Sequence, residues 1–324
     1  MQTMDICAKE TIYKAAAALL LGMFSALPAR GQTPGAFQAL QFSARGAYEP
    51  SFVPVLAPVP VKRGPAPRGG ADIGERLLAA SGRFLGVPYV LGPLGEGPQG
   101  EFDRGPLVSF TGLDCTTFVE QTLAFALGAG DAAALETLRA IRYKDGVISY
   151  ETRNHFPETD WLPNNIAAGF LKDITFEVGG RRISTVKKVI SKRAWYLGKT
   201  EADLEGFETE PEDQRKARLE RLRAAGAGIP DQEALVKYIP LALLPGLLPS
   251  IPSGTVVSRV REARPDKPTV ISHQFLIFDG PEGKTIRHAA SGKRVMDVPA
   301  ADYIAGLANS SWTVLGFNLA AVVR

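Results

Sequence analysis

The chain has 324 residues, 45% of them hydrophobic, and its 37 basic and 34 acidic residues leave a net charge of +3. This near balance is not the basic excess of a nucleic-acid-binding protein, and two cysteines in so long a chain exclude a disulfide framework. The length allows one large domain or two small ones.

The N-terminus is typical of an exported protein. Two lysines precede an apolar run at residues 15–24 that is too short to span a bilayer, and Ala29-Arg30-Gly31 suits cleavage before the next residue. We therefore predict a signal peptide at residues 1–31, with a retained membrane anchor as the alternative. After cleavage we expect no membrane span, a place in the periplasm or cell envelope, and a single cysteine, because Cys7 leaves with the leader.

Residues 32–70 are rich in Pro, Ala and Gly, which predicts an extended linker. Residues 71–324 are then predicted to form a single domain. Its first helix begins at Ile73 and ends near Gly86, and a rigid, turn-rich segment follows. Tyr89 in that segment is a candidate for positioning a substrate, although a half-buried structural tyrosine explains it equally well.

The stretch from Thr111 to Ala126 predicts a helix with one buried stripe. Asp114 is a good N-cap, because its carboxylate can accept from free backbone N–H groups of the first turn. Cys115 follows in that turn, where the helix dipole favours a thiolate. Cys115 is therefore a candidate nucleophile and Asp114 a candidate substrate-binding residue. The alternative for Cys115 is a small buried hydrophobe.

A second helix is predicted at residues 131–143, with Asp131 as its cap, followed by a short strand at 147–150. The next segment, residues 151–165, is predicted to be a loop that carries three side chains suited to binding.

These three candidates are Arg153, His155 and Trp161. Arg153 can pair bidentately with a peptide carboxylate, and Trp161 can stack on a sugar. The alternative is that these are structural side chains of a loop, with Trp161 filling the core.

Six Lys or Arg residues lie between residues 181 and 193, around apolar residues at helical spacing. A solvated helix face is the default interpretation, and an anionic wall polymer or membrane surface is the minority one. Residues 200–235 are predicted to be a charged, peripheral insertion that is poor in apolar anchors. It contains a helix at residues 212–225.

After residue 242 the pattern changes from helix to strand. Apolar runs predict a helix at residues 299–307 and strands at 255–260, 270–278, 285–291 and 313–319. Helices first and an antiparallel sheet last predict an α+β fold, with the nucleophile at a helix start packed on the sheet.

Two of the three histidines, His273 and His288, lie on consecutive predicted strands. A symmetric hairpin about Gly280–Pro281 places them opposite each other on one face, with Cβ atoms about 4.5–5.5 Å apart. A slip of one residue would put them on opposite faces. Two imidazoles on one face favour a functional pair, with satisfied core histidines as the alternative.

These residues fit a thiol hydrolase. Cys115 would attack a carbonyl, His273 would take the thiol proton and return it to the leaving amine, and His288 would orient His273. The Cys115 backbone N–H would face the developing oxyanion. A zinc protein with the same three ligands is one alternative, but we expect no metal and no cofactor, because the sequence holds no short-spaced ligand pair. A non-catalytic wall-binding module is another.

Four segments resemble motifs of the NlpC/p60 papain-like cell-wall hydrolases. Leu113-Asp-Cys-Thr-Thr-Phe-Val119 is similar to their Asp-Cys-Ser-Gly-Phe/Leu-Val signature, and Gly86-Val-Pro-Tyr-Val-Leu-Gly92 to the Gly-x-Pro-Tyr segment that precedes it. Ser272-His-Gln-Phe-Leu-Ile277 resembles their His-Val-Gly-Ile strand. Arg287-His-Ala-Ala-Ser291 resembles the strand that supplies the third catalytic residue.

Within that superfamily the chain looks most like the N-acetylmuramoyl-L-alanine amidase-like branch, first described as a domain of unknown function. The resemblance covers about residues 71–320. Two features depart from the family pattern: Gln274 and Phe275 replace the usual Val-Gly, and the 200–235 insertion is longer than expected. Both departures affect the expected fit of the substrate more than the expected chemistry. The matching segments are Leu113 to Glu120, Tyr143 to Gly146, Thr152 to His155, Trp161 and Lys237 to Pro240.

The resemblance implies a papain-like fold and hydrolysis of peptidoglycan fragments. In the amidase branch the bond that is cut joins the muramyl lactyl group to L-Ala, with a preference for anhydro-muropeptides. The wider superfamily mostly cuts γ-D-glutamyl–diamino acid bonds. Cys115, His273 and His288 do not distinguish the two reactions.

Overall fold

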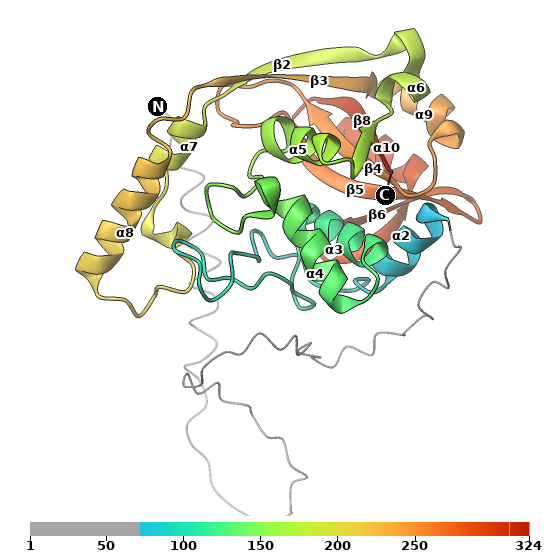
Figure 1. Ribbon diagram of the computed structural model, residues 1–324. Coiled ribbons are helices and arrows are strands. Elements are labelled where there is room, and N and C mark those ends of the chain that lie inside the picture. Colours follow the sequence, from blue (N-terminus) through green and yellow to red (C-terminus); the bar gives the residue numbers. More distant parts are fainter. Residues whose placement is uncertain (1–71, 311, 324) are drawn as a thin grey trace, which may run out of the picture. The chain divides into compact units, whose positions relative to one another are not determined.

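The computed structural model describes residues 72–310 and 312–323 (Figure 1). The predicted signal peptide (1–31) and linker (32–70) lie outside these residues. The described part combines helices with an antiparallel sheet, so the predicted α+β class is confirmed. None of its helices is both long enough and apolar enough to cross a membrane.

The strands of the described residues form one sheet in the order β2-β3-β8-β4-β5-β6-β7, and β1 also pairs with β8. Each pairing is antiparallel. The strands are β1 (Leu171–Asp173), β2 (Ser184–Ile190), β3 (Gln232–Pro240), β4 (Thr255–Arg261), β5 (Ile271–Gly280), β6 (Gly283–Ala289), β7 (Val295–Pro299) and β8 (Val314–Val322).

Helices cover both faces of this sheet. Figure 1 shows α2, α3 and α4 together on one side of β5 and β6, and α10 contacts β6 and β7. The α-helices are α2 (Ile73–Gly82), α3 (Cys115–Leu127), α4 (Asp131–Arg142), α5 (Leu162–Ala167), α6 (Thr175–Gly179), α7 (Lys192–Leu197), α8 (Glu212–Ala225), α9 (Leu244–Leu247) and α10 (Ala300–Gly306).

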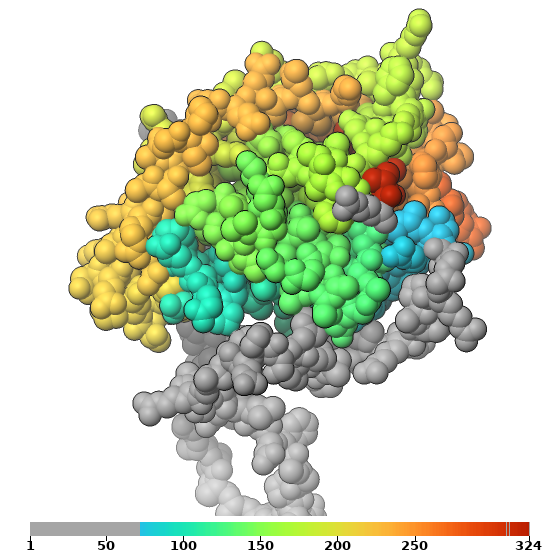
Figure 2. Space-filling view, viewed as in Figure 1, coloured from blue at the N-terminus to red at the C-terminus, as the bar shows by residue number. Residues whose placement is uncertain are grey.

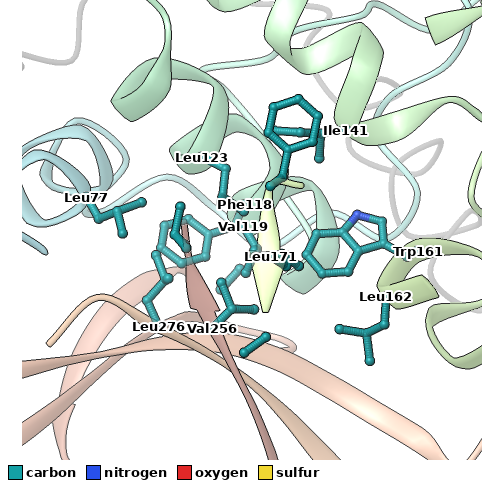
Figure 3. Close-up of a cluster of buried hydrophobic side chains, with 14 of the residues drawn as sticks. Leu77, Phe118, Val119, Leu123, Ile141, Trp161, Leu162, Leu171, Val256 and Leu276 are labelled. Atoms are coloured by element: carbon teal, nitrogen blue, oxygen red, sulfur yellow. The ribbon is translucent and has the colours of Figure 1, made fainter. Parts of the chain in front are cut away.

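Burial on both faces explains why the central strands read as almost continuous apolar runs. On β5, Leu276 belongs to the core cluster that also contains Phe118 of α3, as Figure 3 shows. Its neighbour Phe275 belongs to a second cluster, with Phe317 of β8 and Ile304 of α10. Strand β5 therefore packs against α3 on one face of the sheet and against α10 on the other.

The hairpin of β5 and β6 differs from the prediction by two residues. Ile277 pairs with Ile286, and Gly280 pairs with Gly283, so the turn is centred one residue later than expected. Because side chains alternate with a period of two, this shift keeps both histidines on one face. It makes His273 and His288 diagonal neighbours rather than directly opposed ones.

Several local predictions are wrong. Gly130 is the N-cap of α4, and Asp131 is its first residue. Residues 147–150 form no strand, and the predicted loop contains a π-helical turn at Pro157–Trp161 that continues into α5. Residues 184–190 form a strand instead of a helix. Strand β2 pairs with β3 along its whole length, and this partner was not visible in the local pattern.

The helix of the charged insertion has the bounds that were predicted, Glu212–Ala225. The insertion is better anchored than expected, because Phe207, Leu219 and Leu222 form a small core with Phe102 and Tyr196. Figure 2 shows α8 in yellow against the teal segment around residue 101, where Arg218 and Arg221 of α8 contact Glu101.

Candidate active site

Cys115 is the first residue of α3 and is half-buried. The helix starts here because Asp114 caps it: the Asp114 carboxylate accepts from the Thr117 backbone N–H at 2.8 Å, and the Thr117 hydroxyl accepts from the Asp114 N–H at 2.9 Å. Thr116 Oγ1 donates to Gln274 Oε1 at 3.0 Å. The first turn of α3 is thereby bound to β5, one residue from His273.

The thiol of Cys115 is protonated at neutral pH. Burial raises its pKa to about 11, and the neighbouring Asp114 carboxylate adds to the effect. The backbone N–H groups of Gln274 and Thr116 act in the opposite direction but do not overcome it. The thiolate that the helix dipole was expected to favour is therefore not the resting form.

The two strand histidines contact each other directly. His273 Nε2 lies 2.9 Å from His288 Nδ1, and the rings meet edge to face at a centroid distance of 5.2 Å. Burial, and then the Arg259 guanidinium, lower the pKa of His273 well below its usual value. The same two causes lower the pKa of His288 to about 4, with Lys293 adding to them and Asp297 opposing. Both rings are therefore neutral at pH 7.

Tyr89 lies beside the thiol. Its backbone N–H donates to the Lys293 carbonyl at 3.0 Å, and its hydroxyl hydrogen-bonds the Ser291 side chain. Burial raises the pKa of Tyr89, and the charges that Cys115 and Asp114 can carry raise it further. Tyr89 therefore belongs to the same region as Cys115 and the end of β6.

Asp114 has a structural task. Its Oδ1 accepts from Thr117 and its Oδ2 from the Gly92 backbone N–H at 3.1 Å. Both oxygens are therefore engaged by the backbone, and they join the turn-rich segment to the start of α3.

A cavity of about 320 Å³ opens over the histidine pair. Arg259 and Lys293 contribute positive charge to its wall, and no carboxylate is among its described lining residues. The wall is formed by Arg259, His273, His288, Ala290, Ser291, Lys293, Met296, Val298 and Tyr303.

The predicted loop residues lie elsewhere. Arg153 pairs with Glu96 at 2.5 Å and with Asp103 at 2.8 Å. His155 is buried, and its Nε2–H donates to the Tyr150 carbonyl at 2.7 Å. Both line a second cavity of about 430 Å³, which shares no lining residue with the first. The structure therefore places Arg153 and His155 away from the cavity of the histidine pair.

Trp161 is fully buried, which contradicts its predicted stacking on a sugar. Figure 3 shows its indole packed in the core with Leu162 and Leu171 nearby. Its Nε1–H donates to Glu120 Oε1 at 3.0 Å, and Glu120 also pairs with Arg142 at 2.7 Å. The alternative interpretation, a core tryptophan, is the one that holds.

Arg259 and Tyr303 were not predicted as site residues, and Gln274 was noted only as a departure from a motif. Of the three, Arg259 could have been found from the sequence, because it interrupts an apolar predicted strand. Among the described residues, no group of three or more His, Cys, Asp or Glu side chains is arranged to hold a metal ion.

The fold is similar to that of known amidase-like proteins, and the matching part of the chain includes the site. Residues 79–309 match a family model described as AmiA-like, N-acetylmuramoyl-L-alanine amidase-like, and the chain belongs to this family. No curated protein matches the chain.

The similar crystal structures include one from Legionella pneumophila and one from Bacteroides uniformis. A Legionella pneumophila protein assigned to the DUF1460 family is 31% identical over 78% of this chain and 90% of its own, with a TM-score of 0.74. An N-acetylmuramoyl-L-alanine amidase from Bacteroides uniformis is 25% identical over 78% of this chain and 99% of its own, with a TM-score of 0.57.

Proposed function

We propose that this protein is a cysteine amidase of the papain-like NlpC/p60 superfamily. Its substrate would be a peptidoglycan fragment, cut between N-acetylmuramic acid, in its anhydro form where present, and L-Ala. Membership of the amidase-like family supports the reaction class. The observation that carries the mechanism is the hydrogen bond from the backbone N–H of Gln274, the residue after His273, to the Cys115 thiol, together with the contact between His273 and His288.

The contact between His273 and His288 is compatible with the tautomer of His273 that a base requires. When His273 Nε2–H donates to His288 Nδ1, the remaining nitrogen, His273 Nδ1, carries the lone pair of a base. His288 then holds the ring and stabilises the positive charge that His273 acquires. The low pKa of both rings keeps this base unprotonated at neutral pH.

The reaction starts from a neutral thiol and a neutral imidazole. His273 takes the Cys115 proton as the sulfur attacks the lactyl carbonyl carbon, and the Cys115 backbone N–H stabilises the oxyanion. The imidazolium returns the proton to the L-Ala nitrogen, the C–N bond breaks, and the peptide leaves. Water, deprotonated by His273, then hydrolyses the thioester and frees the thiol.

The predicted signal peptide at residues 1–31 supports action in the periplasm or cell envelope, where such fragments are made. No group of this mechanism requires a metal or an organic cofactor.

Digestion of purified muropeptides, with and without an anhydro-muramyl end, tests the proposal. The wild type and Cys115→Ala are compared by mass spectrometry. We expect free stem peptide and intact disaccharide with the wild type only. Release of a sugar that still carries L-Ala-D-Glu would indicate a γ-D-glutamyl endopeptidase instead. Failure of folded wild-type protein to cut any fragment would favour a binding module.

A further inference from the structure

Arg259 lies on β4 directly opposite His273 of β5 and lines the same cavity. Its Nε donates to Ser272 Oγ at 3.0 Å, and its Nη1 donates to the Tyr303 hydroxyl at 3.3 Å. Both partners are neutral. Two hydroxyl groups thus fix the orientation of the guanidinium while its charge stays uncompensated.

This pairing differs from that of two other buried arginines in the described chain. Arg142 pairs with Glu120, and Arg287 pairs with Asp297 at 2.7 Å. Arg259 has no carboxylate within ion-pair distance among the described residues. Arg261 also lacks an ion pair among these residues, but it donates to the Thr269 carbonyl and does not line the cavity. A half-buried arginine without an acidic partner is costly unless a ligand supplies the missing charge.

The charge of Arg259 opposes the proposed chemistry unless an anion neutralises it. It lowers the pKa of both histidines, although His273 must become positive during the reaction. The other charged or titratable groups that act on His288 or contact it are Lys293, Asp297 and Tyr303. Of these Asp297 is the one carboxylic acid, and Arg287 already engages both of its oxygens.

We propose that Arg259, with Lys293 beside it, binds a carboxylate on the peptide side of the scissile amide. This inference rests on the proposed function. The lactyl carboxyl of the sugar is consumed in the scissile bond, so the free carboxylates belong to the peptide. The first of them is the α-carboxylate of a γ-linked acidic second residue. A guanidinium fork matches such a group in charge and in geometry.

A bound carboxylate would also adjust the catalytic base. It would neutralise the field of Arg259, so the imidazolium would form more readily once the correct peptide is in place. The interaction therefore strengthens as the transition state forms, and it should act on kcat as well as on KM. A peptide with an uncharged second residue would bind without relieving the positive charge near His273.

Two matched substrates test this proposal. Both are muramyl-L-Ala peptides with a γ-linked second residue, which carries an α-carboxylate in one and a carboxamide in the other. We expect wild-type kcat/KM to favour the carboxylate by about 10- to 100-fold, the range of one charge-assisted hydrogen-bonded contact. Arg259→Gln should reduce this ratio to near one, by slowing the carboxylate substrate. Arg259→Lys should retain part of it.

Arg264→Gln is the matched control, because Arg264 pairs with Asp266 at the surface. It should leave the preference unchanged. Equal cleavage of both substrates by the wild type would overturn the inference and leave the amidase proposal standing. Equal slowing of both substrates by Arg259→Gln would do the same.

Binding to Cys115→Ala separates this inference from the proposed function. Calorimetry with the same two compounds should show tighter binding of the carboxylate. Should the wild type cut neither compound while this preference persists, the carboxylate site stands and the amidase proposal fails. Equal affinity for the two compounds would contradict the carboxylate site without any assumption about cleavage.

Discussion

The histidine pair and the Arg153 region contain similar residue types but differ in how their charges are paired. Arg153 has two carboxylate partners, and His155 donates to a backbone carbonyl. Around His273 the reverse holds, since Arg259 has only hydroxyl partners and no carboxylate lines the cavity. Groups with satisfied partners build the scaffold, and groups with unsatisfied charge are available for a substrate.

The scaffold region still serves the nucleophile. Glu120 lies on the same helix as Cys115 and accepts hydrogen bonds from Trp161, which lies in the predicted loop, and from Arg142 at the end of α4. This fully buried network holds α3 in place. The Arg153 region therefore positions the nucleophile, and the histidine pair carries out the chemistry. Substitutions in the first region should mainly change stability, and substitutions in the second should mainly change activity.

The largest effect is expected for His273→Ala. Loss of a general base and acid should lower kcat by about 10²- to 10⁴-fold, measured with muropeptides under saturating conditions. The matched change His155→Ala should lower the thermal midpoint more than His273→Ala does, because its ring packs between Tyr150 and Trp195. A decrease in kcat of less than tenfold for His273→Ala would contradict its assignment as the base.

The reactivity of Cys115 should depend strongly on pH. Because the pKa is raised to about 11, the thiolate fraction rises about tenfold for each pH unit between 7 and 10. The rate of alkylation by iodoacetamide should follow the same slope, with Cys115→Ala as the unlabelled control. A rate that is constant from pH 5 to 9 would reveal a resting thiolate–imidazolium pair instead.

Arg142→Met tests the positioning network. It leaves the buried Glu120 carboxylate without its cation, which should lower the free energy of unfolding by about 3–5 kcal/mol. Denaturant unfolding measures this change. The double variant with Glu120→Leu should recover much of the loss; a double variant as unstable as the single one would show that Arg142 acts through packing alone.

Trp161→Phe should have the smallest effect of this series. It keeps most of the buried ring and removes the donor to Glu120, for an expected loss of about 1–3 kcal/mol. Denaturant unfolding of the purified variant measures this loss. An unchanged free energy of unfolding would contradict the contribution of the Trp161–Glu120 hydrogen bond to stability.

The sequence was informative where a short pattern determines structure. The Asp114 cap and the apolar spacing after Cys115 predicted α3, and the period of two along β5 and β6 kept His273 and His288 on one face despite the wrong register. Sequence alone misassigned β2, because its strand character depends on β3, whose paired residues lie 42 to 54 positions further along the chain. It also misjudged Trp161, whose partner Glu120 is supplied by another helix.

The Arg259 site was hidden for a related reason. A single arginine in an apolar strand indicates a special environment, but its uncompensated charge emerges only when β4, β5 and α10 come together. The same holds for the thiol, since the Gln274 backbone N–H that partly offsets the raised pKa of Cys115 comes from β5.

The central claim is that Cys115 attacks the lactyl amide carbonyl. Rapid acid quenching during turnover, followed by mass spectrometry of the intact protein and its Cys115 peptide, tests it most directly. We predict an adduct on Cys115 with the mass of the muramyl acyl group and no amino acid of the stem, absent in Cys115→Ala. An adduct that contains stem residues, or persistent turnover by Cys115→Ala, would contradict the account.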